Sequence, residues 1–309
     1  MHSAGSAVTL GSLGVLCARG AEARAFLQGQ LSNDLTRLTP ALSLLAGYHN
    51  PQGRVIAILR LIERSSEELL AVLPRELVPE VVQRLGKFIL RAKVKLADES
   101  AAWTITGVIA GDAGAPADAW PAARGGAARV AEAIVVRVAE APGRWLLVTP
   151  AGASPEAAVH CAPAAPGSWQ RLAIAAGEPQ VYRPTSEQFV AQMLNLDALG
   201  AIDFGKGCYT GQEVIARAHY RGRVKRRLQR FRTRGPHALA PGASGELGDG
   251  RSFQVVDAVE LADGRCEFLA VAAIIAPPPA TAEAAAAPPP GQAPRLDADQ
   301  LALPYALPA

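Results

Sequence analysis

The 309-residue sequence contains only four cysteines, and no two of them form a CxxC pair. Structural zinc sites and iron–sulfur clusters commonly take their thiolates from closely spaced cysteines, so the spacing gives no support for a metal held by this chain alone. We therefore predict no metal site. In a reducing compartment we expect free thiols rather than disulfides. The four cysteines are Cys17, Cys161, Cys208 and Cys266.

Other signals are absent as well, and each absence removes a class of protein. No GxGxxG or Walker P-loop motif occurs, so nucleotide binding through those motifs is not expected. The N-terminus lacks the basic and apolar segments of a signal peptide. The apolar run 268–276 is far shorter than the roughly 20 residues that span a bilayer. We expect a cytoplasmic protein without a membrane segment.

Charge and aromatic content are both low. The net charge is +3 and aromatic residues make up 5% of the chain, which by itself predicts neither nucleic-acid nor membrane binding. Nine Lys or Arg residues nevertheless fall within 217–234, and no acid occurs in 214–245. We interpret this run chiefly as a solvated strand edge and loop. RNA binding is the alternative, but Tyr209, Tyr220 and Phe231 form no evident stacking platform, so direct nucleic-acid binding is not favoured.

The pattern of apolar residues predicts a mixed α+β protein with more than one domain. Residues 76–88 carry apolar side chains at helical spacing. The turn at 50–53, followed by a β-branched run, predicts a hairpin, and short strands from 228 to about 275 predict a β module. Helices and strands do not alternate strictly, which favours α+β over α/β. Residues 277–309 are rich in Ala and Pro and are predicted to form a disordered tail.

The most informative segment is 206–213, which reads Lys-Gly-Cys-Tyr-Thr-Gly-Gln-Glu. One interpretation is structural, because Thr210 and Glu213 have the spacing of a capping box that starts a helix. The other interpretation is chemical. Cys208 would lie near the positive end of that helix with Lys206 close by, and this setting favours a thiolate. The residues alone leave both interpretations open.

The segment 204–217 (FGKGCYTGQEVIAR) closely resembles the K-G-C-Y-x-G-Q-E signature of the YgfZ-like folate-binding proteins, relatives of the glycine-cleavage T-protein, an aminomethyltransferase. Further blocks resemble the same family in the same order: 26–35 (FLQGQLSNDL), 48–55 (YHNPQGRV) and 88–96 (FILRAKVKL). The resemblance spans about residues 7 to 275. It implies a three-domain T-protein-like ring with a central channel and a small C-terminal β-barrel-like domain.

The resemblance also implies a division of the chain and a function. Residues 1–50 and 150–226 would form the folate-binding domain 1, 51–149 an α+β domain 2, and 227–276 the C-terminal β domain. Relatives hold tetrahydrofolate in the channel and support the assembly or repair of certain iron–sulfur enzymes, including one that thiolates tRNA. The implied function is a folate-binding accessory protein without classical turnover. Its implied partners are folate and iron–sulfur enzymes or assembly factors, and its implied state is a monomer.

The signature carries the implied site. Cys208 matches the key cysteine of the family and is the candidate catalytic residue. Tetrahydrofolate, or a related reduced folate, is the implied cofactor. The candidate cofactor-binding residues are Lys206, Tyr209, Gln212, Glu213, Arg217 and Arg223. The basic run offers further cations for the anionic glutamyl tail of folate, namely Arg221, Arg223 and Arg226.

Two departures from the family narrow this expectation. The T-protein carries an essential carboxylate on the strand after its first hairpin, whereas 53–58 here reads GRVIAI and the first acid is Glu63. A general base must reach the reacting amine, so the aminomethyltransferase reaction is not expected. Many relatives carry a pterin-binding glutamate where this chain has Ala175. Glu178 follows shortly after, yet the change weakens the expectation of folate binding.

Two alternative functions remain open from the sequence. One is a tetrahydrofolate-dependent aminomethyl- or methyltransferase that uses a different base, and the other is an RNA-binding module. His49 and His219 have no second metal ligand at a useful spacing. We interpret both as ordinary polar residues, with His49 a candidate for lining the channel.

Overall fold

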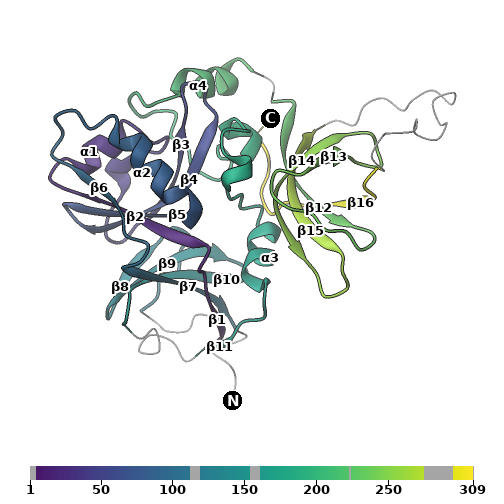
Figure 1. The fold of residues 1–309 in the computed structure, drawn as a ribbon, viewed down its shortest axis with the longest axis horizontal. Coiled ribbons are helices and arrows are strands. Elements are labelled where there is room, and N and C mark those ends of the chain that lie inside the picture. The colour runs from purple at the N-terminus through teal and green to yellow at the C-terminus, as the bar shows by residue number, and fades with distance from the viewer. Residues whose placement is uncertain (1–4, 112–118, 154–160, 223, 275–294, 309) are drawn as a thin grey trace.

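The computed structural model describes residues 5–111, 119–153, 161–222, 224–274 and 295–308. In these ranges the chain forms three β-sheets flanked by short helices (Figure 1). A mixture of helices and strands in which sheets dominate confirms the α+β prediction. Among the described residues, no helix has both the length and the hydropathy needed to cross a membrane.

The first sheet is antiparallel, with the strand order β3-β4-β5-β2-β6. Its strands are β2 (Leu13–Arg19), β3 (Leu44–His49), β4 (Val55–Ser65), β5 (Glu68–Pro74) and β6 (Lys95–Asp98). Helices α1 (Ala23–Gln28) and α2 (Val78–Gly86) lie beside it (Figure 1).

Two predicted elements are confirmed in this sheet. Strands β3 and β4 pair across the turn at 50–53, as the hairpin signal indicated. Helix α2 falls within the predicted helix and buries Val78, Val81 and Leu85, which are spaced by three and four residues. This spacing places all three side chains on one face of the helix.

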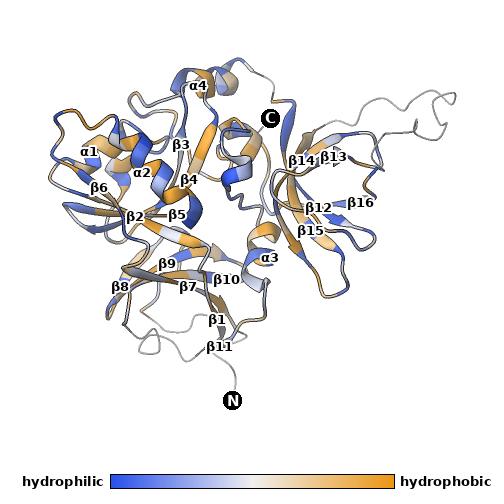
Figure 2. Ribbon diagram, viewed as in Figure 1, coloured by the Kyte–Doolittle hydropathy of each residue, from blue (hydrophilic) through white to orange (hydrophobic). Residues whose placement is uncertain are grey.

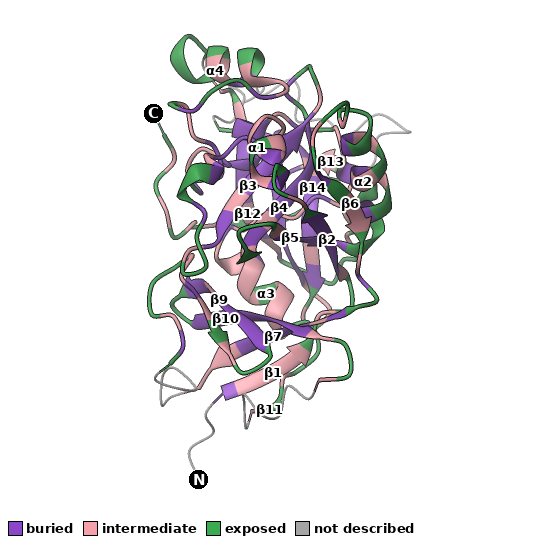
Figure 3. Ribbon diagram, turned by 90° about the vertical axis from the view of Figure 1, so that its left-hand side faces the viewer, coloured by how far each residue is buried: buried purple, intermediate pink, exposed green. Residues whose placement is uncertain are grey.

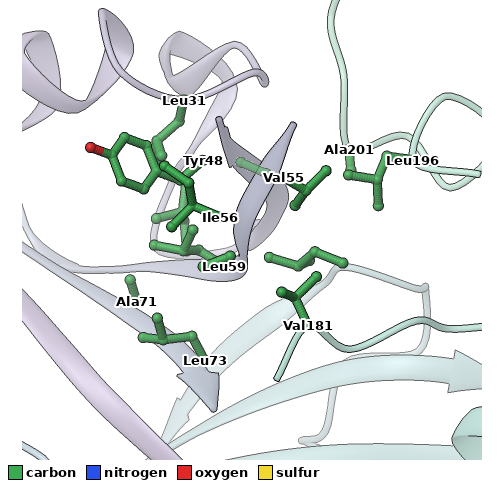
Figure 4. Close-up of a cluster of buried hydrophobic side chains, with 14 of the residues drawn as sticks. Leu31, Tyr48, Val55, Ile56, Leu59, Ala71, Leu73, Val181, Leu196 and Ala201 are labelled. Carbon is green, nitrogen blue, oxygen red and sulfur yellow. The ribbon is translucent and has the colours of Figure 1, made fainter. Parts of the chain in front are cut away.

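The first sheet contains the largest apolar core of the molecule. Strand β4 is buried over most of its length, and its sequence is apolar almost without interruption, as expected for a strand covered on both faces. Val181, Leu196 and Ala201, from the segment 177–202, join Val55 and Leu59 of β4 in one cluster (Figure 4). In Figure 2 the strands likewise carry much of the hydrophobic colour. This packing fixes the segment that leads into the 206–213 motif against the first sheet.

The second sheet has the strand order β11-β1-β7-β10-β9-β8. Its strands are β1 (Gly5–Thr9), β7 (Trp103–Ala110), β8 (Ala127–Val130), β9 (Ala133–Glu140), β10 (Gly143–Pro150) and β11 (Ala162–Pro163). Helix α3 (Ser168–Ala175) follows and lays Trp169 over β7. A Cβ atom on Gly107 would lie 2.5 Å from Cε3 of this indole, so only glycine leaves room for it.

The third sheet has the strand order β13-β14-β15-β12-β16. Its strands are β12 (Arg226–Thr233), β13 (Ser244–Glu246), β14 (Ser252–Glu260), β15 (Cys266–Ala273) and β16 (Ala298–Leu301). Phenylalanine rings fill its own core: Phe231 and Phe268 stack with centroids 5.4 Å apart. This sheet is the β module that the sequence predicts after residue 228.

The prediction of a disordered tail is wrong for residues 295–308. Strand β16 pairs antiparallel with β12, from Ala298 opposite Thr233 to Leu301 opposite Arg230. Beyond it, the Tyr305 hydroxyl donates a 2.8 Å hydrogen bond to the carbonyl of Gly177. The edge of β12 supplies backbone partners that a composition-based interpretation cannot anticipate. The rest of the predicted tail, 277–294, lies outside the described residues.

The expected domain division also differs from the sheets. A boundary between residues 50 and 51 falls inside the β3–β4 hairpin, whose two strands are paired along their length. Residues 51–149 likewise contribute β4, β5 and β6 to the first sheet but β7 to β10 to the second. A sheet cannot be divided between its hydrogen-bonded strands, so these boundaries do not match the sheets.

A buried ion pair joins the third sheet to the segment beside the first. The Arg227 guanidinium on β12 donates to both carboxylate oxygens of Asp197 at 2.9 Å. The same guanidinium donates to the carbonyl of Gln192 at 3.1 Å.

Figure 3 shows buried residues concentrated in the strands, whereas helix α4 (Gln212–Tyr220) lies at the surface and is largely exposed or intermediate.

Candidate functional site

The start of α4 lies directly against the β3–β4 turn. A Cβ atom on Gly211 would lie 2.5 Å from the carbonyl oxygen of Asn50 and 3.0 Å from Cα of Gly53. Gly211 has φ +83° and Gly53 has φ +70°, in the left-handed region that favours glycine. The two backbones therefore approach as closely as they do because both positions lack a side chain.

The expected capping box does not form. The N-cap of α4 is Gly211 rather than Thr210, and no side chain caps the helix. The left-handed backbone at Gly211 starts the helix one residue later than the sequence pattern predicts. Glu213 instead lies in the first turn of α4, where a carboxylate interacts favourably with the positive end of the helix dipole.

Cys208 lies in the loop before α4 and is exposed. The other three cysteines differ from it: Cys17 and Cys266 are buried, and Cys161 is half-buried. Burial raises the pKa of the Cys17 thiol to about 12, and it also raises the pKa values of Cys161 and Cys266. Cys208 is therefore the most accessible of the four cysteines to a partner protein.

Lys206 anchors the motif to the first sheet. Its ammonium group donates to the carbonyl oxygens of Gln28, Leu31 and Asn33 at 2.6, 2.6 and 3.0 Å. These carbonyls belong to the end of α1 and the turn after it, where backbone acceptors have no helical partners. Burial lowers the pKa of Lys206 to about 8. The positive neighbour that the sequence offers to Cys208 is thus engaged in holding the backbone.

Tyr209 and His49 form a buried aromatic pair behind the motif, with ring centroids 6.3 Å apart. Among the described residues, neither the Tyr209 hydroxyl nor either ring nitrogen of His49 has a hydrogen-bond partner. Burial raises the pKa of Tyr209 to about 12 and lowers the pKa of His49 to about 3, so both are neutral at pH 7. The sequence singled out neither residue as a buried polar group.

The remaining candidates from the motif lie on or near α4. The side-chain amide of Gln212 donates to the carbonyl of Lys206 at 3.5 Å. Glu213 and Arg217 are exposed on the helix. Arg223 lies outside the described residues. The structure therefore gathers the described motif residues around one loop and one helix.

A cavity lies elsewhere, between the three sheets. Its volume is about 480 Å³, within the usual range for small-molecule sites. Its walls come from β1, β4, β5, β9, β10, α3 and β14, and none of the described candidate cofactor-binding residues from the motif lines it. The polar and aromatic residues on its wall include Arg60, Arg124, Arg144, Trp169, Gln170, Glu178, Tyr182 and Asp257.

One part of this cavity is cationic. Arg144 on β10 is buried, and its Nη2 donates to Glu178 at 2.8 Å. Its guanidinium carbon lies 5.1 Å from the centre of the Trp169 ring. Nε and Nη1 of Arg144 have no partner in the described part of the chain. Burial also lowers the pKa of Arg60, on β4, to about 10. Nε and Nη1 of Arg144 are themselves buried, so what this wall offers an anionic ligand is the charge of its arginine side chains.

Another part of the cavity is acidic. Asp257 on β14 is buried, and its Oδ1 accepts hydrogen bonds from Nε2 of Gln170 at 2.7 Å and from the amide of Ala258 at 2.9 Å. Its Oδ2 accepts from the Tyr182 hydroxyl at 3.3 Å. Burial raises the pKa of Asp257 to about 6 despite these hydrogen bonds. The cavity is thus lined by a carboxylate together with arginine side chains.

Most of these cavity residues carry no signal in the sequence. Glu178 is the acid that follows Ala175, and the structure places it on the wall beside Arg144. Asp257 left a signal, because it is a single acid in the apolar run Val255–Val259. Trp169 and Arg144 left none, since only the packing of α3 against the second sheet brings them together.

The lack of a strand acid is confirmed in three dimensions. Strand β4 carries no carboxylate before Glu63, and Glu63 forms a 2.7 Å ion pair with Arg24 beside α1. Glu63 is not part of the cavity wall. No carboxylate of this strand therefore faces the cavity.

Much of the basic run is paired within the protein. On β12, Arg227 bonds Asp197 and Arg232 contacts Glu267 at 3.3 Å. Arg230 also pairs with Glu267. Arg226 donates to the carbonyl of Val271 at 3.1 Å. These contacts fit the interpretation of the run as part of a folded strand better than that of an RNA-binding surface.

Comparisons with known proteins match this arrangement. No family model matches the chain. The chain is 33% identical to the tRNA-modifying protein YgfZ of Edwardsiella ictaluri, over 84% of this chain and 81% of that protein. It is also 33% identical to the protein of the same name from Klebsiella pneumoniae, over 84% and 82%. The fold resembles that of glycine cleavage system aminomethyltransferase T from Bartonella henselae, with a TM-score of 0.68 and 12% identity, over 88% of this chain and 79% of that chain.

Proposed function

Since this chain belongs to the YgfZ family, we propose that it binds a reduced folate in the cavity between its three sheets. We further propose that it acts through Cys208 in iron–sulfur cluster assembly or repair. The observation that carries the proposal is the cavity itself, in which an indole, arginine side chains and a buried carboxylate line one space. Because its relatives are named tRNA-modifying proteins, the proposed clients include tRNA-modifying iron–sulfur enzymes.

We propose that this cavity corresponds to the central channel of the T-protein-like ring. Each of the three sheets then forms one domain of the ring, and the third sheet is the small C-terminal β domain. The cavity walls support this, because residues from all three sheets line one space. We also propose that the protein is located in the cytoplasm and is a monomer.

The chemistry of the walls fits tetrahydrofolate. The Trp169 indole offers a ring surface for a heterocycle, and the arginine side chains of the wall offer positive charge for a carboxylate. The tail-binding role first expected of Arg221, Arg223 and Arg226 passes in this proposal to Arg60, Arg124 and Arg144. When bound, the folate supplies a carrier for a one-carbon unit.

Cys208 is the proposed reactive group because it is the exposed cysteine of the chain. Its loop is held by the Lys206 anchor and by the glycine contact between α4 and the β3–β4 turn. A thiol so placed can ligate iron transiently, exchange with a disulfide of a partner, or accept a one-carbon adduct. The geometry is compatible with each of these three roles.

Isothermal titration of tetrahydrofolate under anaerobic conditions tests the folate part of the proposal. We expect the wild type to bind tetrahydrofolate. Trp169→Ala should lower the affinity about tenfold or more, because the pterin ring of the ligand would lose the indole on which it stacks. Trp120→Ala is the matched control, since Trp120 packs in a different cluster, against Trp145, and does not line the cavity. A wild-type protein that binds no reduced folate would rule out this function.

A further inference from the structure

Asp257 reaches the cavity because β14 is irregular at this point. Its pairing with β15 shifts register between Val255 and Asp257. A bulge of this kind redirects the side chains that follow it. Val255 packs in the core of the third sheet, whereas Asp257 lies on the cavity wall against Gln170 of α3. The carboxylate therefore leaves its own sheet and faces the space that the three sheets share.

The hydrogen bonds of Asp257 leave acceptor capacity unused. A carboxylate offers about four acceptor sites. Oδ1 accepts from Gln170 and Ala258, but Oδ2 accepts only the 3.3 Å bond from Tyr182 among the described residues. Among the described residues no Lys or Arg forms an ion pair with Asp257, and Arg144 on the same cavity wall is paired with Glu178. A buried carboxylate without a cation is costly unless donors complete its shell.

The surroundings limit which ligand supplies those donors. From α3 the carboxylate faces Gln170, and from the segment after α3 it faces Tyr182, whose pKa is raised by burial. From the neighbouring strand β15 its register partner is the apolar Leu269. Arg144 and Glu178 lie elsewhere on the same cavity wall and balance each other in charge.

Trp169 and Asp257 both line this cavity, so a flat ring surface and the carboxylate belong to one space. The indole is held over Gly107 of β7 and is also covered by the Arg144 guanidinium. A planar heterocycle lying along this wall would present its edge to Asp257. A ring edge with adjacent N–H groups would give Oδ2 of Asp257 the further donors that the described residues do not supply.

We infer that Asp257 recognises the N–H edge of the bound heterocycle, which for a folate is the 2-amino and ring N–H pair of the pterin. This inference rests on the proposed folate binding and adds to it a specificity-determining residue from the third sheet. Tyr182 and Gln170 position the carboxylate. The alternative is a purely structural role, in which Asp257 only holds α3 against β14 through its hydrogen bond with Gln170.

The test compares two ligands on the full-length protein by anaerobic calorimetry. Tetrahydrofolate carries the pterin, and p-aminobenzoylglutamate lacks it. We expect Asp257→Asn to weaken tetrahydrofolate about tenfold or more, because the amide offers one acceptor oxygen and turns two N–H donors toward the ligand. The same variant should bind p-aminobenzoylglutamate like the wild type. Asp263→Asn, in an exposed turn paired with Arg265, is the matched control and should change neither ligand.

A second measurement needs no variant. The affinity of the wild type for tetrahydrofolate should fall as pH drops from 7.5 through about 6, as Asp257 gains a proton and loses an acceptor. Unchanged tetrahydrofolate affinity in Asp257→Asn, or equal losses for both ligands, would overturn the inference while leaving folate binding in place. Absence of tetrahydrofolate binding to the wild type would overturn the proposed function and the inference together.

Discussion

The Glu178 carboxylate lies 2.8 Å from the guanidinium of Arg144, and the two side chains form one wall of the cavity between the three sheets. Arg144 is almost wholly buried. Among the described residues, Glu178 is the one carboxylate with which it forms an ion pair. Arg124 approaches Glu178 from the other side at 3.7 Å. One acid therefore pairs with two arginines of the cavity wall and holds their positive charge in place.

Glu178→Ala should destabilise the protein by about 3 kcal/mol, because it leaves a charge buried without its partner. The measurement is urea unfolding at pH 7. Glu140→Ala, at an exposed strand end, serves as the control and should stay within about 0.5 kcal/mol of the wild type. Combining Glu178→Ala with Arg144→Met should recover part of the loss. If the double variant is no more stable than Glu178→Ala alone, the cost does not come from the unpaired guanidinium.

Lys206→Met should cost about 2 to 3 kcal/mol, because three backbone carbonyls lose their shared donor. Lys87→Met, at an exposed position after α2, is the matched control. Hydrogen exchange should quicken for amides of residues 28–34 and of the motif loop. Exchange that quickens evenly over the whole chain instead would show that Lys206 does not act as a local anchor.

Gly211→Ala should destabilise the protein by at least about 2 kcal/mol, since the new methyl group would lie 2.5 Å from the Asn50 carbonyl at a left-handed φ. Gly207→Ala is a close control in the same loop, because its Cβ would have no atom within 4 Å. Thermal melts of the two variants provide the comparison. Equal melting temperatures would contradict the contact between α4 and the β3–β4 turn.

The stability of the ligand-free protein should depend on Asp257. Burial raises its pKa to about 6 in the folded state from the ordinary value of 3.8. The folded state therefore holds the proton more tightly, and the stability contributed by this group is present below pH 3.8 and lost as pH rises through about 6. The shift amounts to about 3 kcal/mol.

Asp257→Asn removes the pH dependence of stability that comes from this carboxyl group. Urea unfolding without ligand should show the stability of the variant relative to the wild type rising between pH 4.5 and pH 7. Comparing the two proteins at each pH cancels the titration of the other carboxylates. A difference that does not vary with pH would show that Asp257 is not protonated more readily in the folded state.

Local sequence signals predicted local structure well. The turn at 50–53 and the β-branched run after it gave the β3–β4 hairpin, and the apolar spacing of 76–88 gave α2. Both signals act over a few residues, so the surrounding fold does not need to be known. The family resemblance carried by 206–213 was also visible in the sequence.

The cavity and the details of the motif could not be predicted in this way. Arg144, Trp169 and Asp257 lie far apart along the chain, and only the packing of the three sheets brings them together. The capping-box pattern was misleading because the contact of Gly211 with the β3–β4 turn sets where α4 begins. Strand β16 could not be predicted from the composition of the C-terminal segment, because its partner strand β12 lies far away in the sequence.

The role of Cys208 is tested most directly by complementation of a bacterial strain that lacks its YgfZ protein. Wild type, Cys208→Ala and Cys161→Ala would be expressed at equal levels, and the activities of iron–sulfur enzymes would be scored, including those that modify tRNA. We predict that wild type and Cys161→Ala restore the activities and that Cys208→Ala does not. Equal rescue by all three proteins would contradict a reactive role for the exposed thiol and leave Cys208 without a function in this process.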